Sequence, residues 1–349
     1  MDAPSKTTEV TSLDSSPGLQ RPAPVRTSLD FALEPLTPWL KDPQLTELCL
    51  YRPGEAYLER GREWTVVPLP FASFEWAMRL AKLVGNATRQ KIDAGSPLLS
   101  AGLPSGERVQ FAIPPAVLPG HVAIAIRRPS QIAFSITQLV ARGIFAKTRQ
   151  GQEGRRTEDE ELQSRLAGRD FGAFMQRAVQ LKKNILVSGA TGSGKTTWTK
   201  ALIRAIPKEE RLITIEDAPE LSLDSHPNHV RLFYSKDGQG RSKVTPKELL
   251  ESCLRLRPDR ILLAELRSEE AFYYLRNIAS GHPGSITSIH AGSCELALEQ
   301  LMLMVRQSRA GQGLAREDIH ALIARTVDVV IQFGVEGGER LVREIRFQS

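Results

Sequence analysis

The sequence predicts an α/β protein in which a P-loop domain with a mostly parallel sheet follows a smaller α+β domain. The first observation is the segment Gly189 to Thr196, which has the spacing G-x-x-x-x-G-K-T between an apolar run and a helix-like run. The second is the alternation of strand-like and helix-like runs from Phe171 onward, which is typical of parallel sheets covered by helices. The third is that strand-like runs of the first 130 residues are separated by proline and glycine, which favour turns.

Composition divides the 349 residues into four parts. Residues 1–28 contain no aromatic residue and are rich in Ser, Thr and Pro, so we expect a disordered arm. Residues 29–130 form the predicted amino-terminal α+β domain. Balanced charges dominate 131–168, where we expect a charged, solvated linker or an exposed helix. The P-loop domain then covers 169–349.

The local patterns place individual elements in both domains. In the first domain we expect a short amphipathic helix at 36–40, a helix at 74–84, and strands at 45–51, 56–60, 108–113 and 122–127. In the second we expect strands at 185–187, 212–215, 261–264 and 286–290, helices at 197–206 and 246–256, and a final hairpin from 327–333 and 340–347.

The glycine-rich segment predicts a phosphate-binding loop. Its glycines allow backbone N–H groups to turn toward one diphosphate, and the following helix presents its positive end to the same anion. Lys195 supplies a charge at the β- and γ-phosphates, and Thr196 offers a hydroxyl to Mg²⁺. The expected nucleotide contacts are Gly189, Ala190, Thr191, Gly192, Ser193, Gly194, Lys195, Thr196 and Thr197.

Two apolar runs end in carboxylates at the sheet edge where the loop is expected. Glu265 follows one of them and is predicted to polarise the attacking water. Glu216 ends the other and is predicted to hold the metal through a water, with Asp217 as the less favoured alternative. Either acid could instead cap a helix or lie on the surface.

Two histidines bracket the strand-like run at 286–290. His290, at its end, could contact the γ-phosphate, although a lone histidine is more often structural. His282, His290 and Cys294 could be considered a metal set, but their spacing matches no standard zinc pattern and a fourth ligand is missing.

Composition narrows the environment and the partners. Three scattered cysteines do not form a disulfide framework and favour a reducing, cytoplasmic location. No run of eighteen apolar residues and no signal peptide is recognised, so any membrane association is expected to be peripheral. The formal charge of +6 and the pI of 9.3 suit an acidic ligand, nucleic acid or an anionic membrane surface.

Four segments in order, GATGSGKTT, LITIEDAPEL, LRLRPDRILLAELRSEEAF and GHPGSITSIHAGS, resemble the nucleotide boxes of the traffic ATPases of bacterial type IV secretion and conjugation systems. The similarity extends into the first domain through WLKDPQLTELCLYRPGEAYLE and SGERVQFAIPPAVLPGHVAIAIRRPS. The resemblance implies a RecA-like domain that hydrolyses ATP with Mg²⁺, in a homohexamer whose amino-terminal domains form a second ring and close over the nucleotide.

The resemblance also implies site residues. It gives Lys195, Glu216, Glu265 and His290 their places in the four boxes. From the first domain it implies two arginines that reach the nucleotide, Arg108 and Arg127, although Arg128 could replace Arg127. Arg257 and Arg267 match arginines near the acidic boxes. Each of these two could instead form a salt bridge that holds its loop.

The predicted function is therefore an ATP-driven motor for substrate export or pilus assembly in a type IV secretion system. It would lie at the cytoplasmic face of the inner membrane with other ATPases and membrane components of the system. An alternative is a type II secretion or type IV pilus ATPase, which commonly carries a tetracysteine zinc insert that this sequence lacks. A nucleic-acid translocase is disfavoured because no basic segment interleaves aromatic residues. A nucleotide-gated scaffold is disfavoured by Glu265.

Overall fold

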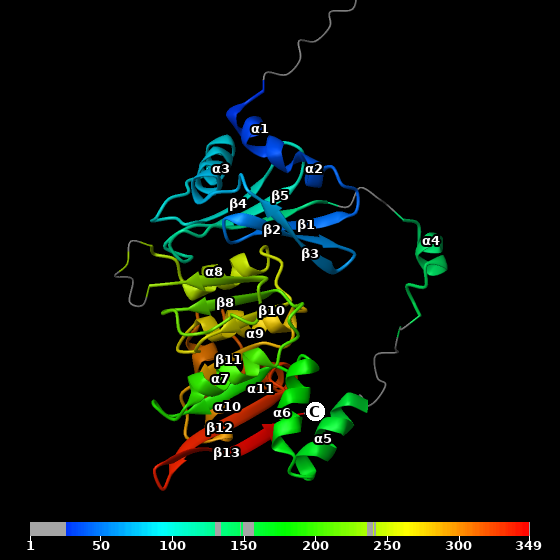
Figure 1. Ribbon diagram of the computed structural model, residues 1–349. Helices are drawn as coiled ribbons and strands as arrows, with labels where there is room; N and C mark the ends of the chain where they lie inside the picture. Colours follow the sequence, from blue (N-terminus) through cyan, green and yellow to red (C-terminus); the bar gives the residue numbers. More distant parts are fainter. Residues whose placement is uncertain are drawn as a thin grey trace, which may run out of the picture.

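The computed structural model describes residues 26–129, 134–146, 148, 157–235, 240 and 242–348. All but the last three residues of the predicted arm lie outside these ranges. The described chain forms two sheet-based domains, one stacked on the other (Figure 1). No described helix is both long enough and apolar enough to cross a membrane.

The first domain is a six-stranded antiparallel sheet in the order β3-β2-β1-β6-β5-β4. Helices cover its outer face, and Thr27 opens the first of them with a capping box to Asp30. Its elements are α1 (Ser28–Leu33), the 3-10 helix η1 (Glu34–Leu36), α2 (Thr37–Leu40), β1 (Leu45–Leu50), β2 (Gly54–Arg60), β3 (Glu63–Leu69), α3 (Phe74–Ala87), β4 (Leu98–Gly102), β5 (Arg108–Ala112) and β6 (Ala123–Arg127).

The second domain is a seven-stranded sheet in the order β13-β12-β7-β11-β10-β8-β9, parallel except for the pair β12 and β13. This confirms the α/β class with a mostly parallel sheet. Its elements are α5 (Thr157–Ala167), α6 (Phe171–Gln180), β7 (Ile185–Gly189), α7 (Lys195–Arg204), β8 (Leu212–Glu216), β9 (His229–Phe233), α8 (Pro246–Cys253), β10 (Arg260–Leu263), α9 (Glu270–Ala279), β11 (Ile286–Ile289), α10 (Cys294–Gln307), α11 (Arg316–Thr326), β12 (Val329–Glu336) and β13 (Glu339–Phe347).

Alternation along the strands builds one core on each face of this sheet. Ile185 and Val187 of β7 pack with α5, α6 and α7. Leu186, between them, belongs to the core formed with α8, α9, α10 and α11. Because β7, β10 and β11 run parallel, the segments that follow them meet at one edge, where the phosphate loop lies.

The two domains share a buried interface. Leu48 and Leu50 of β1 face the helices of their own domain, whereas Cys49 and Tyr51 join the core of the second domain. The Tyr51 hydroxyl lies 3.5 Å from the carbonyl of Arg231. The inner face of the first sheet therefore packs beside β9, at the end of the second sheet.

Part of the charged block at 131–168 packs more closely than a solvated linker would. Residues 157–167 form α5, in which Leu162 is fully buried and Asp159 pairs with Lys183. Glu161 of the same helix bonds Arg177 of α6. α4 (Ile136–Ala141), earlier in this block, lies apart from both domains (Figure 1).

Candidate nucleotide site

The loop between β7 and α7 has a backbone that side chains would obstruct. Gly192 and Gly194 have φ angles of 77° and 102°, in the left-handed region. A Cβ on Gly189 would lie 2.6 Å from the Ser193 hydroxyl and 2.9 Å from the carbonyl of Phe333. Gly194 caps α7 without a side-chain hydrogen bond, so the first N–H groups of this ten-residue helix are available for an anion.

Lys195 points back into this loop. Its Nζ donates to the carbonyls of Gly189 at 2.7 Å and Ala190 at 3.0 Å, and lies 3.3 Å from Nδ1 of His290. Burial lowers the pKa of Lys195, partly opposed by the charge of Glu265. An arriving phosphate would offer this ammonium a stronger partner than two neutral carbonyls.

A continuous chain of polar contacts leads from Lys195 to the carboxylates. Nε2 of His290 lies 2.5 Å from Oε1 of Glu265, on the side of the ring opposite the Lys195 contact. Arg267 donates from Nε to Oε2 of Glu265 at 2.8 Å and also pairs with Asp217. The structure thus brings together Lys195, His290, Glu265 and Arg267 with Asp217, the less favoured of the two acids that the sequence offered for the metal.

Glu216 lies apart from this chain, and its surroundings disagree with the predicted metal role. Its side chain is fully buried. Oε1 accepts from Thr214 and from Arg231 Nε, and Oε2 accepts from two backbone N–H groups and from Arg231 Nη2, at 2.7 to 3.0 Å. Five donors leave no oxygen free for a metal-bound water. Asp217, the alternative, is the acid that is connected to Glu265.

The remaining residues of the loop fit a nucleotide with Mg²⁺. Thr196 and Thr197, in the first turn of α7, are exposed. Ala190, Thr191 and Gly192, in the loop before the helix, are exposed as well. The Ser193 hydroxyl is buried and has no hydrogen-bond partner among the described residues. Among all the residues that the structure describes, no group of three His, Cys, Asp or Glu side chains is arranged to hold a metal ion. Mg²⁺ commonly takes few protein ligands together with waters and phosphates, which suits Thr196.

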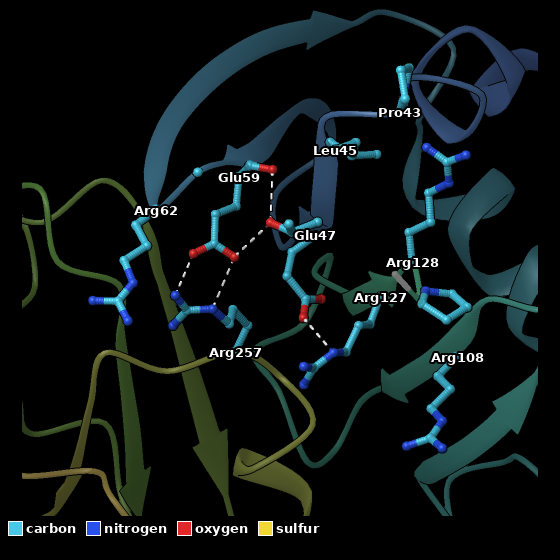
Figure 2. A pocket seen from close by; sticks show the side chains of 12 residues that line it. Pro43, Leu45, Glu47, Glu59, Arg62, Arg108, Arg127, Arg128 and Arg257 are labelled. Atoms are coloured by element: carbon cyan, nitrogen blue, oxygen red, sulfur yellow. Dashed lines mark hydrogen bonds and ion pairs between the residues drawn. The ribbon is translucent and has the colours of Figure 1, made fainter. Parts of the chain in front are cut away.

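The predicted arginines of the first domain lie in a different place. Arg108 and Arg127 line a cleft of about 900 Å³ with Arg62, Arg128 and Arg257. Figure 2 shows Arg257 beside Glu59 and Arg127 beside Glu47, with the side chains of Arg62, Arg108 and Arg128 farther from these two acids. No residue of the phosphate loop belongs to the described lining of this cleft.

Sheet order explains the separation within one chain. The first domain packs beside β9, and β9 is four strands from β7, which is about 19 Å at the usual spacing. Arg257 also lies before β10, at the opposite edge of the sheet from the loop. It forms two hydrogen bonds with Glu59 and pairs with Asp259. The predicted contact of Arg257 with nucleotide is therefore absent from the described single chain, and the alternative salt bridge is present.

The cleft distinguishes Arg127 from Arg128. The side chain of Arg127 is 69% exposed, and its nearest acid, Glu47, lies 3.6 Å away. Arg128 is half-buried and donates to the carbonyl of Asp42. Arg127 is the one that is free to meet a further anion.

Glu47 is a residue that the sequence pattern did not reveal. Its side chain is 5% exposed and Oε2 has no partner among the described residues. Burial raises the pKa of Glu47 to about 7, despite the opposing charge of Arg127. It lies in β1 between Thr46 and Leu48, and an acid at such a position gives no signal of burial in the sequence.

The model of the type II/IV secretion system protein family matches residues 32–345. The chain belongs to this family. The type IV secretion system protein VirB11 of Bartonella quintana is 45% identical over 90% of this chain and 91% of its own length. VirB11 of Brucella suis is 46% identical over 89% and 87%, respectively.

A solved structure agrees with this membership. The crystal structure of the VirB11 ATPase from the Brucella suis type IV secretion system, in complex with sulphate, has a TM-score of 0.88 and 45% identity to this chain. The match covers 92% of this chain and 94% of the Brucella suis chain. Within the type II/IV secretion family the chain is thus a traffic ATPase of the type IV branch, as the four boxes suggested.

Proposed function

We propose that this traffic ATPase hydrolyses Mg-ATP at the loop between β7 and α7 and, as a homohexamer, powers a type IV secretion system. The observation that carries the proposal is the connected chain from Lys195 through His290 to Glu265, beside a loop whose glycines leave room for phosphates. Similarity to VirB11 proteins over nine-tenths of the chain supports the secretion role.

The loop residues divide the binding between them. Backbone N–H groups at the start of α7 and the unpartnered Ser193 hydroxyl bind phosphate oxygens, with Thr196 and Thr197 at the same turn. Lys195 leaves the carbonyls of Gly189 and Ala190 for the β- and γ-phosphates. Mg²⁺ would neutralise developing charge on the phosphates, and Thr196 with a water near Asp217 would hold it.

Glu265 acts on the attacking water. Its Oε1 lies 2.5 Å from Nε2 of His290 and has no hydrogen-bond partner among the described residues, so it is the oxygen available to accept a proton from water. Arg267 holds the other oxygen and orients the carboxylate. His290 contacts both Glu265 and Lys195. It therefore links the carboxylate that acts on the water to the ammonium that binds the γ-phosphate.

Arg108 and Arg127 complete the site of a neighbouring subunit. Within one chain they are several strands away from Lys195, yet both are exposed, and among the described residues the side chain of Arg127 has only a contact of 3.6 Å to Glu47. Cations supplied in trans stabilise the transition state of phosphoryl transfer in many ATPases. A ring of six provides such neighbours and lets closure of one domain on the next do work.

The partners follow from this role. We propose that the ring docks on other ATPases and inner-membrane components of the secretion system, from the cytoplasmic side. The formal charge of +6 would favour a peripheral contact with an anionic membrane surface. The ring would power substrate export, pilus assembly or both.

Two substitutions test the proposed function. Lys195→Ala is expected to abolish both binding of fluorescent ADP and ATP turnover. Glu265→Gln is expected to keep binding and lower turnover at least a hundredfold. Lys200→Ala, on the same helix, and the exposed Glu269→Gln serve as matched controls. Turnover at the wild-type rate in Lys195→Ala would overturn the assignment.

A further inference from the structure

The carboxyl-terminal hairpin extends beyond the sheet at the phosphate loop. β12 runs parallel to β7, and their last paired residues are Phe333 and Gly189. From there β12 continues through Val335 to Glu336 and turns back into β13. Val335 is two residues past Gly189 in this register, which is about 7 Å beyond the end of β7.

The turn places an arginine at this level. Gly337 and Gly338 both have left-handed φ angles, 59° and 85°, which is typical of a tight two-residue hairpin turn. The turn fixes Arg340 opposite Val335. A Cβ on Gly194 would lie 3.5 Å from Cδ of Arg340, so the side chain of Arg340 runs directly over the residue that precedes Lys195.

The face of the hairpin agrees with this contact. Phe333 and Val335 alternate onto the same face of β12. The ring of Phe333 lies 5.6 Å from that of Trp198, one turn into α7. Arg340, paired with Val335, therefore lies on the face that carries α7. It is exposed, and its guanidinium has no hydrogen bond or ion pair among the described residues.

Sheet order says which end of the nucleotide this arginine meets. β7 lies between β11 on one side and β12 on the other. His290 follows β11 and Glu265 follows β10, so the γ-phosphate chemistry lies on the β11 side. Arg340 comes from the β12 side. A nucleotide bound with its γ-phosphate on the β11 side would have its α- and β-phosphates, which both ATP and ADP carry, nearer the side from which Arg340 comes.

We propose that Arg340 is a nucleotide-binding residue that contacts the α- or β-phosphate from the carboxyl-terminal hairpin. This rests on the proposed function, because it assumes that the loop holds a nucleotide. The hairpin thus forms one side of the nucleotide site, and its turn at Gly337 and Gly338 determines where Arg340 lies. Loss of one charge-assisted hydrogen bond corresponds to about a tenfold loss of affinity.

The test is equilibrium binding of ADP and of ATP, each carrying a fluorescent ribose label, to the full chain. Energy transfer from tryptophan reports the bound label. Arg340→Ala is expected to weaken both nucleotides about tenfold and by the same factor, and Arg340→Lys to recover part of the loss. Arg346→Ala is the matched control, because Arg346 is an exposed arginine of the same strand that pairs with Val330, on the opposite face.

The outcomes separate this inference from the proposed function. If Lys195→Ala loses binding while Arg340→Ala binds like wild type or like Arg346→Ala, the role of Arg340 is overturned and the ATPase assignment stands. A loss confined to ATP would overturn the contact with the α- or β-phosphate. If wild type binds neither nucleotide, both proposals fail. Thermal unfolding of Arg340→Ala at the wild-type midpoint verifies that the variant is folded.

Discussion

At the scale of single residues, the described chain pairs its charges in two different ways. Lys195 rests on neutral carbonyls and a histidine, and burial lowers its pKa, so it can exchange these partners for a phosphate. Arg257, by contrast, is already bound to two carboxylates. The residues whose charge is least satisfied are therefore the ones available to a ligand.

Glu47 makes stability depend on pH. Its folded pKa is raised above the ordinary value of 4.5 to about 7, so the folded state binds more protons in that interval. The free energy of unfolding should fall by roughly 3 kcal/mol as pH rises from 4.5 to 7, and should then level off. Glu47→Gln should remove this fall and unfold at higher urea than wild type at pH 8.

The exposed Glu63→Gln, on β3, is the control for this measurement. It should keep the wild-type slope of unfolding free energy against pH. If Glu47→Gln kept that slope too, the burial of Glu47 would not govern its ionisation.

The phosphate loop could be predicted residue by residue because its conformation depends on local glycines. The choice between Glu216 and Asp217 could not. It depends on Arg231 and Arg267, which lie 15 and 50 residues away from the acids that they bind. Adjacent acids at a strand end look alike in sequence, and only the tertiary structure determines which one is neutralised by an internal arginine.

At the scale of elements, strands with a clear apolar pattern were predictable. The first hairpin, the strands around the phosphate loop and the terminal hairpin all occur near their predicted bounds. β3, β4 and β9 were not predicted. β3 lies at an edge and buries only its last residue, so its apolar signal is weak, and β9 is a short strand at the end of its sheet.

Glu216, at the end of β8, accepts two hydrogen bonds from Arg231 of β9 and so connects the two strands. Glu216→Ala would leave that arginine largely buried without its partner, and should lower the free energy of unfolding by about 3 kcal/mol. Asp217→Asn should change stability by about 1 kcal/mol or less and reduce Mg-dependent turnover about tenfold. Urea unfolding and ATPase assays over a range of Mg²⁺ concentrations measure both.

A Glu216→Ala protein with wild-type stability but no turnover would restore the metal role first predicted for Glu216. Equal loss of stability in both variants would mean that the two acids share a structural role.

At the scale of the molecule, the arginines of the first domain and the loop of the second belong to different regions of one chain. The sequence indicated both sets, since each has its own local motif. It could not indicate their separation, because that depends on the first sheet packing beside β9 and not over β7. The long connection between the domains allows other arrangements in a ring without requiring them.

Mixing two inactive variants tests most directly the central claim that subunits share each ATP site. Lys195→Ala and Arg127→Ala should each have little ATPase activity alone. If Arg127 serves a neighbour's loop, subunits mixed in equal amounts and reassembled should recover turnover at about one quarter of the sites, by random assortment around a closed ring. No recovery in mixed hexamers of verified composition would contradict the claim and confine each site to a single chain.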